Sequence, residues 1–178
     1  QWNFHHWWPW IGPAIAQTPL TILLSVRTPK PNPYLAFISY RTEEDGSTAL
    51  LIKRSLAEHG LKVFLDVHSL HAGKFDEQLL NEIDSATFFI LLLSPNSLDR
   101  CVNPDDWVLR ELTHALDKKK TIIPVLKSGF RFDTIKKEIS DLPQIEKLSK
   151  FHGVPFATKD FDGFINQLKS LLLRPKEK

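Results

Sequence analysis

Short apolar runs alternate with helix-like patterns along most of this chain. Runs of roughly four to eight apolar residues, bounded by polar or turn-forming residues, are typical of buried strands. They occur at residues 34–39, 61–65, 87–93, 121–126 and, more weakly, 154–156. The run at 87–93 contains no charged residue, as expected of a central parallel strand covered on both faces. Pro124 cannot donate to a sheet ladder, so we expect an outer position or a bulge in its strand.

Between these runs, apolar residues recur every three or four positions, which is the period of an amphipathic helix. The first such pattern covers residues 49–56, with Asp45 or Ser47 as its expected N-cap and Gly60 as its expected end. Further helices are expected around residues 79–83, 107–116, 132–139 and 161–172. Strands that alternate with helices predict an α/β fold, with a parallel five-stranded sheet and helices on both faces.

In sheets of this kind, ligands bind beyond the carboxyl ends of the strands. The loops that follow the first three predicted strands all lie at that edge. We therefore expect Arg41, the loop at residues 66–75 and Glu111 to approach one crevice.

Residues 1–33 differ from the rest of the sequence. They hold four of the five tryptophans and six of the twelve prolines, and only Arg27 and Lys30 are charged. The domain prediction is a Pro/Trp-rich extension or linker at 1–33, a folded domain at 34–173 and a polar tail at 174–178. Residues 7–26 have the length of a membrane segment, but three prolines argue against a continuous spanning helix. Membrane contact and a role as a flap or partner-binding extension both stay open.

Composition limits the classes of function. The chain begins with Gln and contains no Met, so we expect a fragment or a processed product. Its formal charge of +2 and the absence of a long basic run predict no nucleic-acid binding. A single cysteine, Cys101, excludes an intrachain disulfide and favours a reducing compartment such as the cytoplasm.

Trp107 and Glu111 are the most informative pair of residues. Positions four apart lie on one face of a helix, so a π surface stands beside a carboxylate. Apolar residues at 108, 112, 115 and 116 form what we expect to be a separate, core-facing stripe. An aromatic ring beside an acid would suit cleavage of a nicotinamide–ribose bond. The alternative interpretation is a packing tryptophan and a solvated glutamate.

Four segments resemble the signatures of NAD-cleaving TIR domains, as found in animal axon degeneration and bacterial defence. They are residues 37–41 (FISYR), 63–67 with 70–75 (VFLDV and LHAGKF), 93–101 (LSPNSLDRC) and 106–111 (DWVLRE). The resemblance implies a flavodoxin-like TIR fold and a catalytic role for Glu111. It further implies substrate-binding roles for Trp107, Tyr40, Arg41, Phe75, Lys74, Asp66 and Gly73.

The resemblance also implies an activity: an NAD+ glycohydrolase in a defence or cell-death signalling pathway. NAD+ would be the substrate, with no further cofactor and no metal. Self-association through the BB loop, which contains residues 70–75, would complete the site. The product stays open between ADP-ribose, a cyclic form and a base-exchanged dinucleotide. From the residues alone, Arg41 fits either a contact with the ligand's phosphates or a salt bridge.

Three other functions are compatible with parts of the sequence. The first is a TIR scaffold that signals by assembly without catalysis. The second is a phosphoacceptor receiver domain, but its Mg²⁺ site needs an acidic pair where this chain has Ser39, Tyr40 and Arg41. The third is a nucleoside-processing transferase, which would act on free nucleosides rather than on NAD+.

Overall fold

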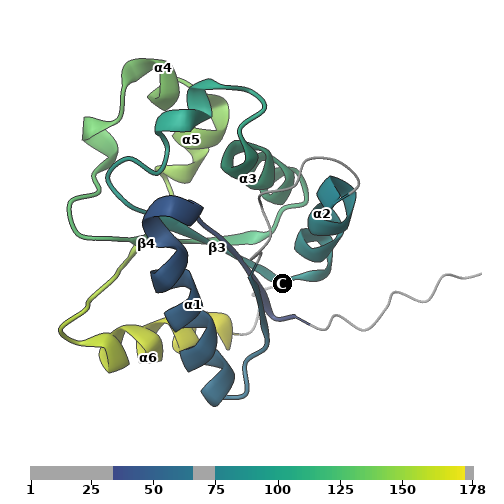
Figure 1. Ribbon diagram of the computed structural model, residues 1–178, viewed down its shortest axis with the longest axis vertical. Helices are drawn as coiled ribbons and strands as arrows, with labels where there is room; N and C mark the ends of the chain where they lie inside the picture. The colour runs from purple at the N-terminus through teal and green to yellow at the C-terminus, as the bar shows by residue number, and fades with distance from the viewer. Residues whose placement is uncertain (1–33, 66–74, 175–178) are drawn as a thin grey trace, which may run out of the picture. The chain divides into compact units, whose positions relative to one another are not determined.

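A parallel sheet of five strands forms the centre of the domain (Figure 1). The computed structural model describes residues 34–65 and 75–174, and predictions that fall on residues 1–33, 66–74 and 175–178 lie outside this part. The strands are β1 (Ala36–Ser39), β2 (Val63–Leu65), β3 (Phe88–Leu93), β4 (Thr121–Leu126) and β5 (Val154–Pro155). Their order in space is β2-β1-β3-β4-β5, which confirms the predicted fold class.

Helices cover both faces of the sheet. They are α1 (Thr42–Glu58), α2 (Phe75–Ser85), α3 (Trp107–Asp117), α4 (Lys137–Ser140), α5 (Pro143–Leu148) and α6 (Phe161–Leu172). Two 3₁₀ turns, η1 (Asp99–Val102) and η2 (Phe132–Thr134), complete the described elements. The core on one face is formed with α1 and α6, and the core on the other with α2, α3, α4 and α5.

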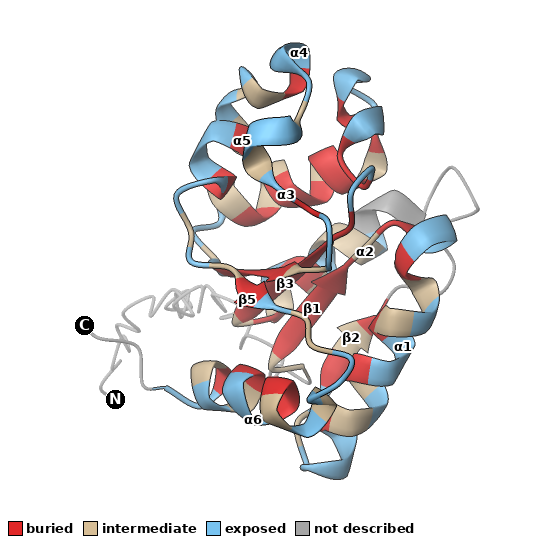
Figure 2. Cartoon of the chain, turned by 90° about the vertical axis from the view of Figure 1, so that its left-hand side faces the viewer, coloured by how far each residue is buried: buried red, intermediate tan, exposed pale blue. Residues whose placement is uncertain are grey.

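The central strands are buried on both faces, as Figure 2 shows in red for β1 and β3. Side chains alternate along a strand, so Ala36 and Ile38 pack into the α1–α6 core while Phe37 packs into the opposite core. All six residues of β3 are buried, which confirms the prediction for the charge-free run. Alternation also assigns Ser39, the last residue of β1, to the face that α3 covers.

Three local predictions are wrong. Helix α1 begins at Thr42, after Arg41, so Asp45 lies inside the helix and is fully buried instead of capping it. Pro124 is not in an outer strand, because β4 pairs with β3 and β5 on its two sides; the β5 ladder begins one residue later, at Val125. The single helix expected at 132–139 is divided into η2 and α4, because the backbone is extended at Ile135.

The end of α1 follows the prediction. Gly60 adopts φ +76, a left-handed conformation that glycine reaches without strain, directly after the last turn. None of the helices within residues 34–65 and 75–174 combines the length and apolarity that crossing a bilayer requires.

Candidate active site

A hydroxyl at the end of β1 meets a carboxylate on α3. Ser39 Oγ donates a hydrogen bond to Glu111 Oε2 at 2.5 Å, although the two residues are 72 positions apart in the sequence. Both are buried, with Ser39 1% exposed and Glu111 3% exposed. The pleat of β1 turns Ser39 toward α3, so this contact follows from strand alternation and the crossover that brings α3 over the same face. The candidate catalytic group is therefore anchored to a central strand.

Glu111 belongs to the buried face of α3, which corrects the expectation that it stands apart from the packed stripe. The helix buries Val108, Leu109, Leu112 and Ala115 together with Glu111. Residues 108, 111, 112 and 115 follow the i, i+3, i+4, i+7 spacing of one helix face, so an acid at position 111 falls within that face. Its surroundings shield the carboxylate from bulk water, where its charge would be screened most strongly.

Trp107 begins α3, one turn before Glu111. Its indole is half-buried, and its Nε1 is a buried donor without a hydrogen-bond acceptor among the described residues. The guanidinium of Arg110 lies over the indole ring, with Cζ 4.8 Å from the ring centroid. The aromatic surface predicted to stack on a planar cation thus already holds one from its own helix.

Arg41 forms a buried ion pair with Asp106. Its Nη1 lies 2.7 Å from Asp106 Oδ2 and its Nη2 3.1 Å from Oδ1, while Nε and Nη2 donate to the carbonyl oxygen of Ser97 at 3.0 and 2.8 Å. The salt bridge is one of the two roles that the sequence allowed for Arg41, here in buried form. Its contact with substrate phosphates stays a prediction.

Asp106 also caps α3. Its side chain accepts a hydrogen bond from the Leu109 N–H at 3.1 Å. Burial alone would raise the pKa of Asp106, but hydrogen bonds from Arg41 and the Leu109 N–H hold that pKa below its ordinary value. The neighbouring thiol responds in the opposite direction: burial, followed by the charge of Asp106, raises the pKa of Cys101 to about 12.

A second buried acid lies at the carboxyl edge of the sheet, on α1. Asp45 accepts hydrogen bonds from Ser94 Oγ at 2.9 Å and Lys127 Nζ at 2.8 Å. Both partners follow strands, since Ser94 comes directly after β3 and Lys127 directly after β4. Asp45 is thus held in a structural ion pair.

The other predicted site residues differ in what the structure shows of them. Tyr40 is partly buried and packs against the α1–α6 core. Phe75 begins α2, whereas Asp66, Gly73 and Lys74 lie outside the described residues. Their substrate-binding roles and the catalytic role of Glu111 stay predictions. The sequence reasoning missed the Ser39 contact, although a serine in phase with Phe37 on a buried strand was a usable signal.

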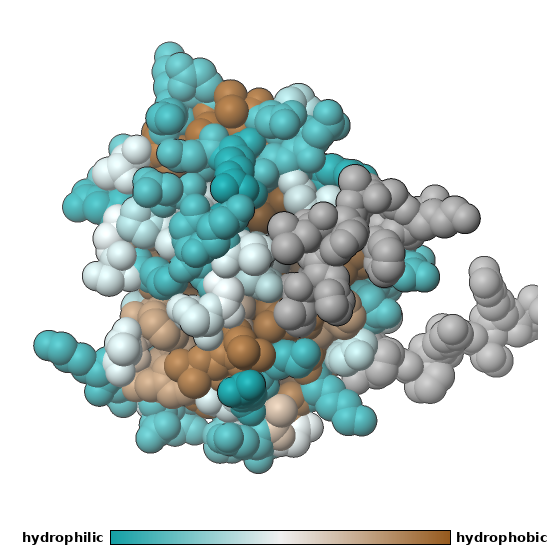
Figure 3. All heavy atoms as spheres, in the orientation of Figure 1, coloured by the Kyte–Doolittle hydropathy of each residue, from teal (hydrophilic) through white to brown (hydrophobic). Residues whose placement is uncertain are grey.

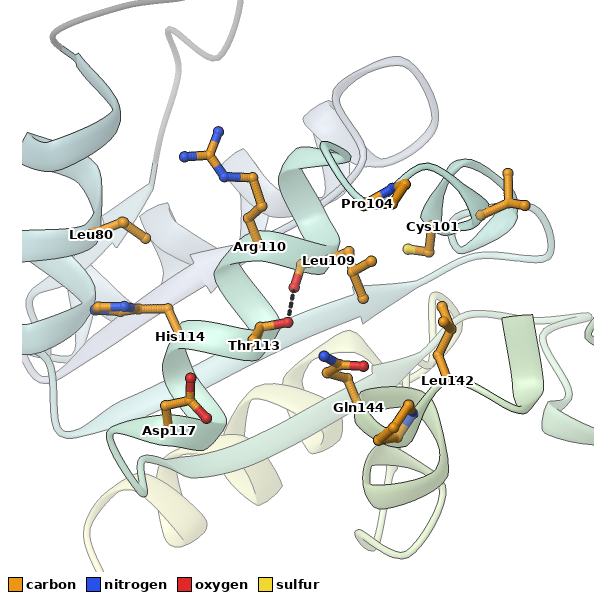
Figure 4. Close-up of a pocket in the computed structure, with 12 residues that line it drawn as sticks. Leu80, Cys101, Pro104, Leu109, Arg110, Thr113, His114, Asp117, Leu142 and Gln144 are labelled. Atoms are coloured by element: carbon orange, nitrogen blue, oxygen red, sulfur yellow. Dashed lines mark hydrogen bonds between the residues drawn. The ribbon is translucent and has the colours of Figure 1, made fainter. Parts of the chain in front are cut away.

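A hollow of about 550 Å³ lies along α3, as Figure 4 shows. Leu80, Leu142 and Gln144 line it together with Arg110 and His114 of α3. Trp107 and Glu111 are not part of this lining. Arg110 therefore belongs to both features: its guanidinium lies over the Trp107 ring, and its side chain forms part of the wall of the hollow.

Comparison with known proteins now identifies the class. A model of the TIR domain matches residues 36–169, and the chain belongs to this family. It is similar to the NAD(+) hydrolase tir-1 of Caenorhabditis elegans, with 46% identity over 121 residues, covering 66% of this chain and 12% of the relative. It is also similar to the NAD(+) hydrolase sarm1 of Drosophila melanogaster, with 38% identity over 140 residues, covering 76% of this chain and 10% of the relative.

The fold has solved counterparts as well. The TIR domains of the activated Roq1 resistosome match with a TM-score of 0.60 and 20% sequence identity, over 79% of this chain and 99% of that chain. At this identity the likeness concerns the fold. The chain spans about a tenth of the length of the curated relatives named above.

Proposed function

We propose that this chain is an NAD+ glycohydrolase that cleaves the bond between nicotinamide and ribose. The observation that supports this best is the buried Glu111 carboxylate, held by Ser39 at the end of β1 and one helical turn from Trp107. The edge where it lies is the one where parallel α/β sheets bind ligands. Two relatives named NAD(+) hydrolase support the same activity. NAD+ enters as substrate, and the proposed chemistry needs no further cofactor.

The proposed reaction uses the charge already present in NAD+. The C–N bond to ribose breaks, its electron pair leaves with the pyridinium nitrogen, and nicotinamide departs neutral. Positive charge then develops on the ribosyl centre, as in glycoside hydrolysis. Glu111 stabilises that charge from a site shielded from water, while Trp107 stacks on the departing ring. Attack by water on the ribosyl carbon, with release of one proton to the solvent, gives ADP-ribose.

The test measures loss of NAD+ in the presence of wild-type protein and of Glu111→Ala. Removal of one preorganised electrostatic group costs a factor of about a hundred to a thousand in kcat. Glu138→Ala is the matched control, because Glu138 is an exposed glutamate on α4. Equal rates for wild type and Glu111→Ala would remove Glu111 from the mechanism. Failure of the wild type to consume NAD+ at any concentration would support the scaffold function instead.

The identity of the nucleophile sets the product. A ribosyl cation reacts with water, with an internal adenine nitrogen or with an added pyridine base, so hydrolysis, cyclisation and base exchange share the first step. We propose hydrolysis as the principal outcome, accompanied by base exchange. Mass spectrometry of products with and without an added pyridine distinguishes the three outcomes. Incubation with deoxynucleosides tests the transferase alternative.

We further propose that the domain acts when it self-associates in the cytoplasm. Helix α1 exposes Leu50 and Leu51, which are 39% and 46% accessible, and Figure 3 shows apolar surface where α1 and α6 lie. Such a patch favours contact with another protein surface. Residues 70–74 of the BB loop, which is predicted to complete a neighbour's site, lie outside the described residues. Specific activity should therefore rise with protein concentration, and a concentration-independent value would contradict self-association.

A further inference from the structure

Ser39 is the polar exception in a strand that is otherwise apolar. The other residues of β1 are Ala36, Phe37 and Ile38, and all four are buried. A buried hydroxyl needs a hydrogen-bond partner, because its desolvation is otherwise uncompensated. The Ser39 hydroxyl, at the junction between β1 and α1, donates its hydrogen bond to the Glu111 carboxylate.

The same junction holds α3 a second time. Arg41, two residues after Ser39, binds Asp106 at the N-terminus of α3. Trp107 and Arg110 lie between the two anchored positions, Asp106 and Glu111. The β1–α1 junction thus fixes both ends of the helical turn on which the proposed chemistry depends.

We propose that Ser39 is a positioning residue for the NAD+-cleaving reaction: its hydroxyl holds the Glu111 carboxylate ionised and in one orientation. This inference rests on the proposed function. A hydrogen bond donated to the charged form of a carboxyl group favours that form. A donor on a central strand also limits the rotation of a long glutamate side chain, so the negative charge faces the ribosyl centre before the reaction begins.

The chain contains a matched control for this contact. Ser94 Oγ also donates to a buried carboxylate, that of Asp45, from the end of β3 at the same edge of the sheet. Ser94 is 5% exposed, so both serines are buried. Removing either hydroxyl leaves a buried acid with one donor fewer, but only Ser39 contacts the candidate catalytic group.

The experiment compares Ser39→Ala, Ser39→Thr and Ser94→Ala in the 178-residue chain, with kcat and KM for NAD+ measured from pH 4 to 8. A hydrogen bond to a charged group corresponds to about one pKa unit, or about tenfold in an equilibrium. We expect Ser39→Ala to lower kcat about tenfold, to leave KM within about twofold and to move the acidic limb of the kcat profile up by about one pH unit. Ser39→Thr should restore the limb, and Ser94→Ala should not move it.

The folded fraction of each variant is measured by circular dichroism at every pH and kcat is corrected for it, because a destabilised variant that unfolds in acid would also move the limb. If the acidic limb of the kcat profile lies at the same pH in Ser39→Ala as in the wild type, and Glu111→Ala is inactive, the role of Ser39 is overturned. The proposed function is then unaffected. Full activity of Glu111→Ala overturns the proposed function itself. In the Glu111→Ala background, a further fall in residual activity on removal of the Ser39 hydroxyl would contradict action through Glu111.

Discussion

Arg41 and Asp106 form a two-pronged ion pair that joins the start of α1 to the start of α3, with both side chains 6% exposed. Planar guanidinium geometry suits such paired contacts with a carboxylate. The pair is satisfied further by the Ser97 carbonyl oxygen and the Leu109 N–H. It therefore links three segments of the carboxyl edge of the sheet.

Loss of the charge on Asp106 should destabilise the fold. Asp106→Asn keeps a side chain able to cap α3 but leaves Arg41 buried without its counter-ion, which typically costs about 3–5 kcal/mol. Asp106→Ala removes the cap as well and should cost about 1 kcal/mol more. Urea unfolding measures both. The control is Asp105→Asn at the exposed neighbouring position, and equal destabilisation by Asp105→Asn and Asp106→Asn would contradict the importance of the ion pair.

The same ion pair predicts that the free energy of unfolding depends on pH in the acidic range. The pKa of Asp106 is lower in the folded protein than its ordinary value of 3.8, so its ionised form stabilises the fold. This contribution is complete above the unfolded-state pKa and is lost as the pH falls through that value toward the folded-state pKa. The difference in unfolding free energy between wild type and Asp106→Asn should therefore shrink below about pH 4. A difference that stays constant from pH 7 to pH 2 would be the contrary result.

Removal of Arg110 should improve substrate binding if Trp107 stacks on nicotinamide. The guanidinium over the indole competes for the aromatic surface, through a cation–π contact worth about 0.5–1 kcal/mol at an exposed site. We expect Arg110→Gln to lower the KM for NAD+ by about two- to fivefold. Arg100→Gln, which removes an exposed arginine outside α3, is the control. A higher KM in Arg110→Gln would show instead that Arg110 contributes to binding.

The single thiol should react slowly in the native protein. Burial raises the pKa of Cys101 to about 12, and the thiolate is the reactive form. At pH 8 we expect iodoacetamide to modify Cys101 at least about a hundredfold faster in denaturant than in the folded state. Mass spectrometry reads this directly, because the chain contains one cysteine. Similar rates in the two states would mean that the thiol is accessible.

Local patterns predicted the sheet well because its strands are strongly apolar. The charge-free run at 87–93 predicted a strand buried on both faces, and β3 is that strand. The wrong predictions included a position where the local sequence indicates one role and contacts with distant residues give another. Asp45 resembles a cap in the sequence, yet it lies inside α1 because its partners, Ser94 and Lys127, come from the ends of two other strands.

The candidate site was predicted only in part, for a related reason. Spacing in the sequence identified Trp107 and Glu111 as neighbours on one helix. The same spacing allows position 111 on the buried face, but a glutamate is stable there only with a donor such as Ser39, which lies 72 positions earlier and which spacing within the helix does not indicate. Likewise, Arg41 finds Asp106 across 65 positions. The periodicity of helices and strands predicts which residues of one element share a face. These two polar pairs join different elements, so they depend on the order of the strands in the sheet.

The double attachment of α3 limits how this domain can change shape. Sliding or rotating the helix along β1 would separate Ser39 from Glu111 and Arg41 from Asp106 together, so strand and helix must move as a single rigid unit. A change of shape in this domain is then expected in the segments around that unit, while the Glu111 carboxylate keeps its place beside Ser39.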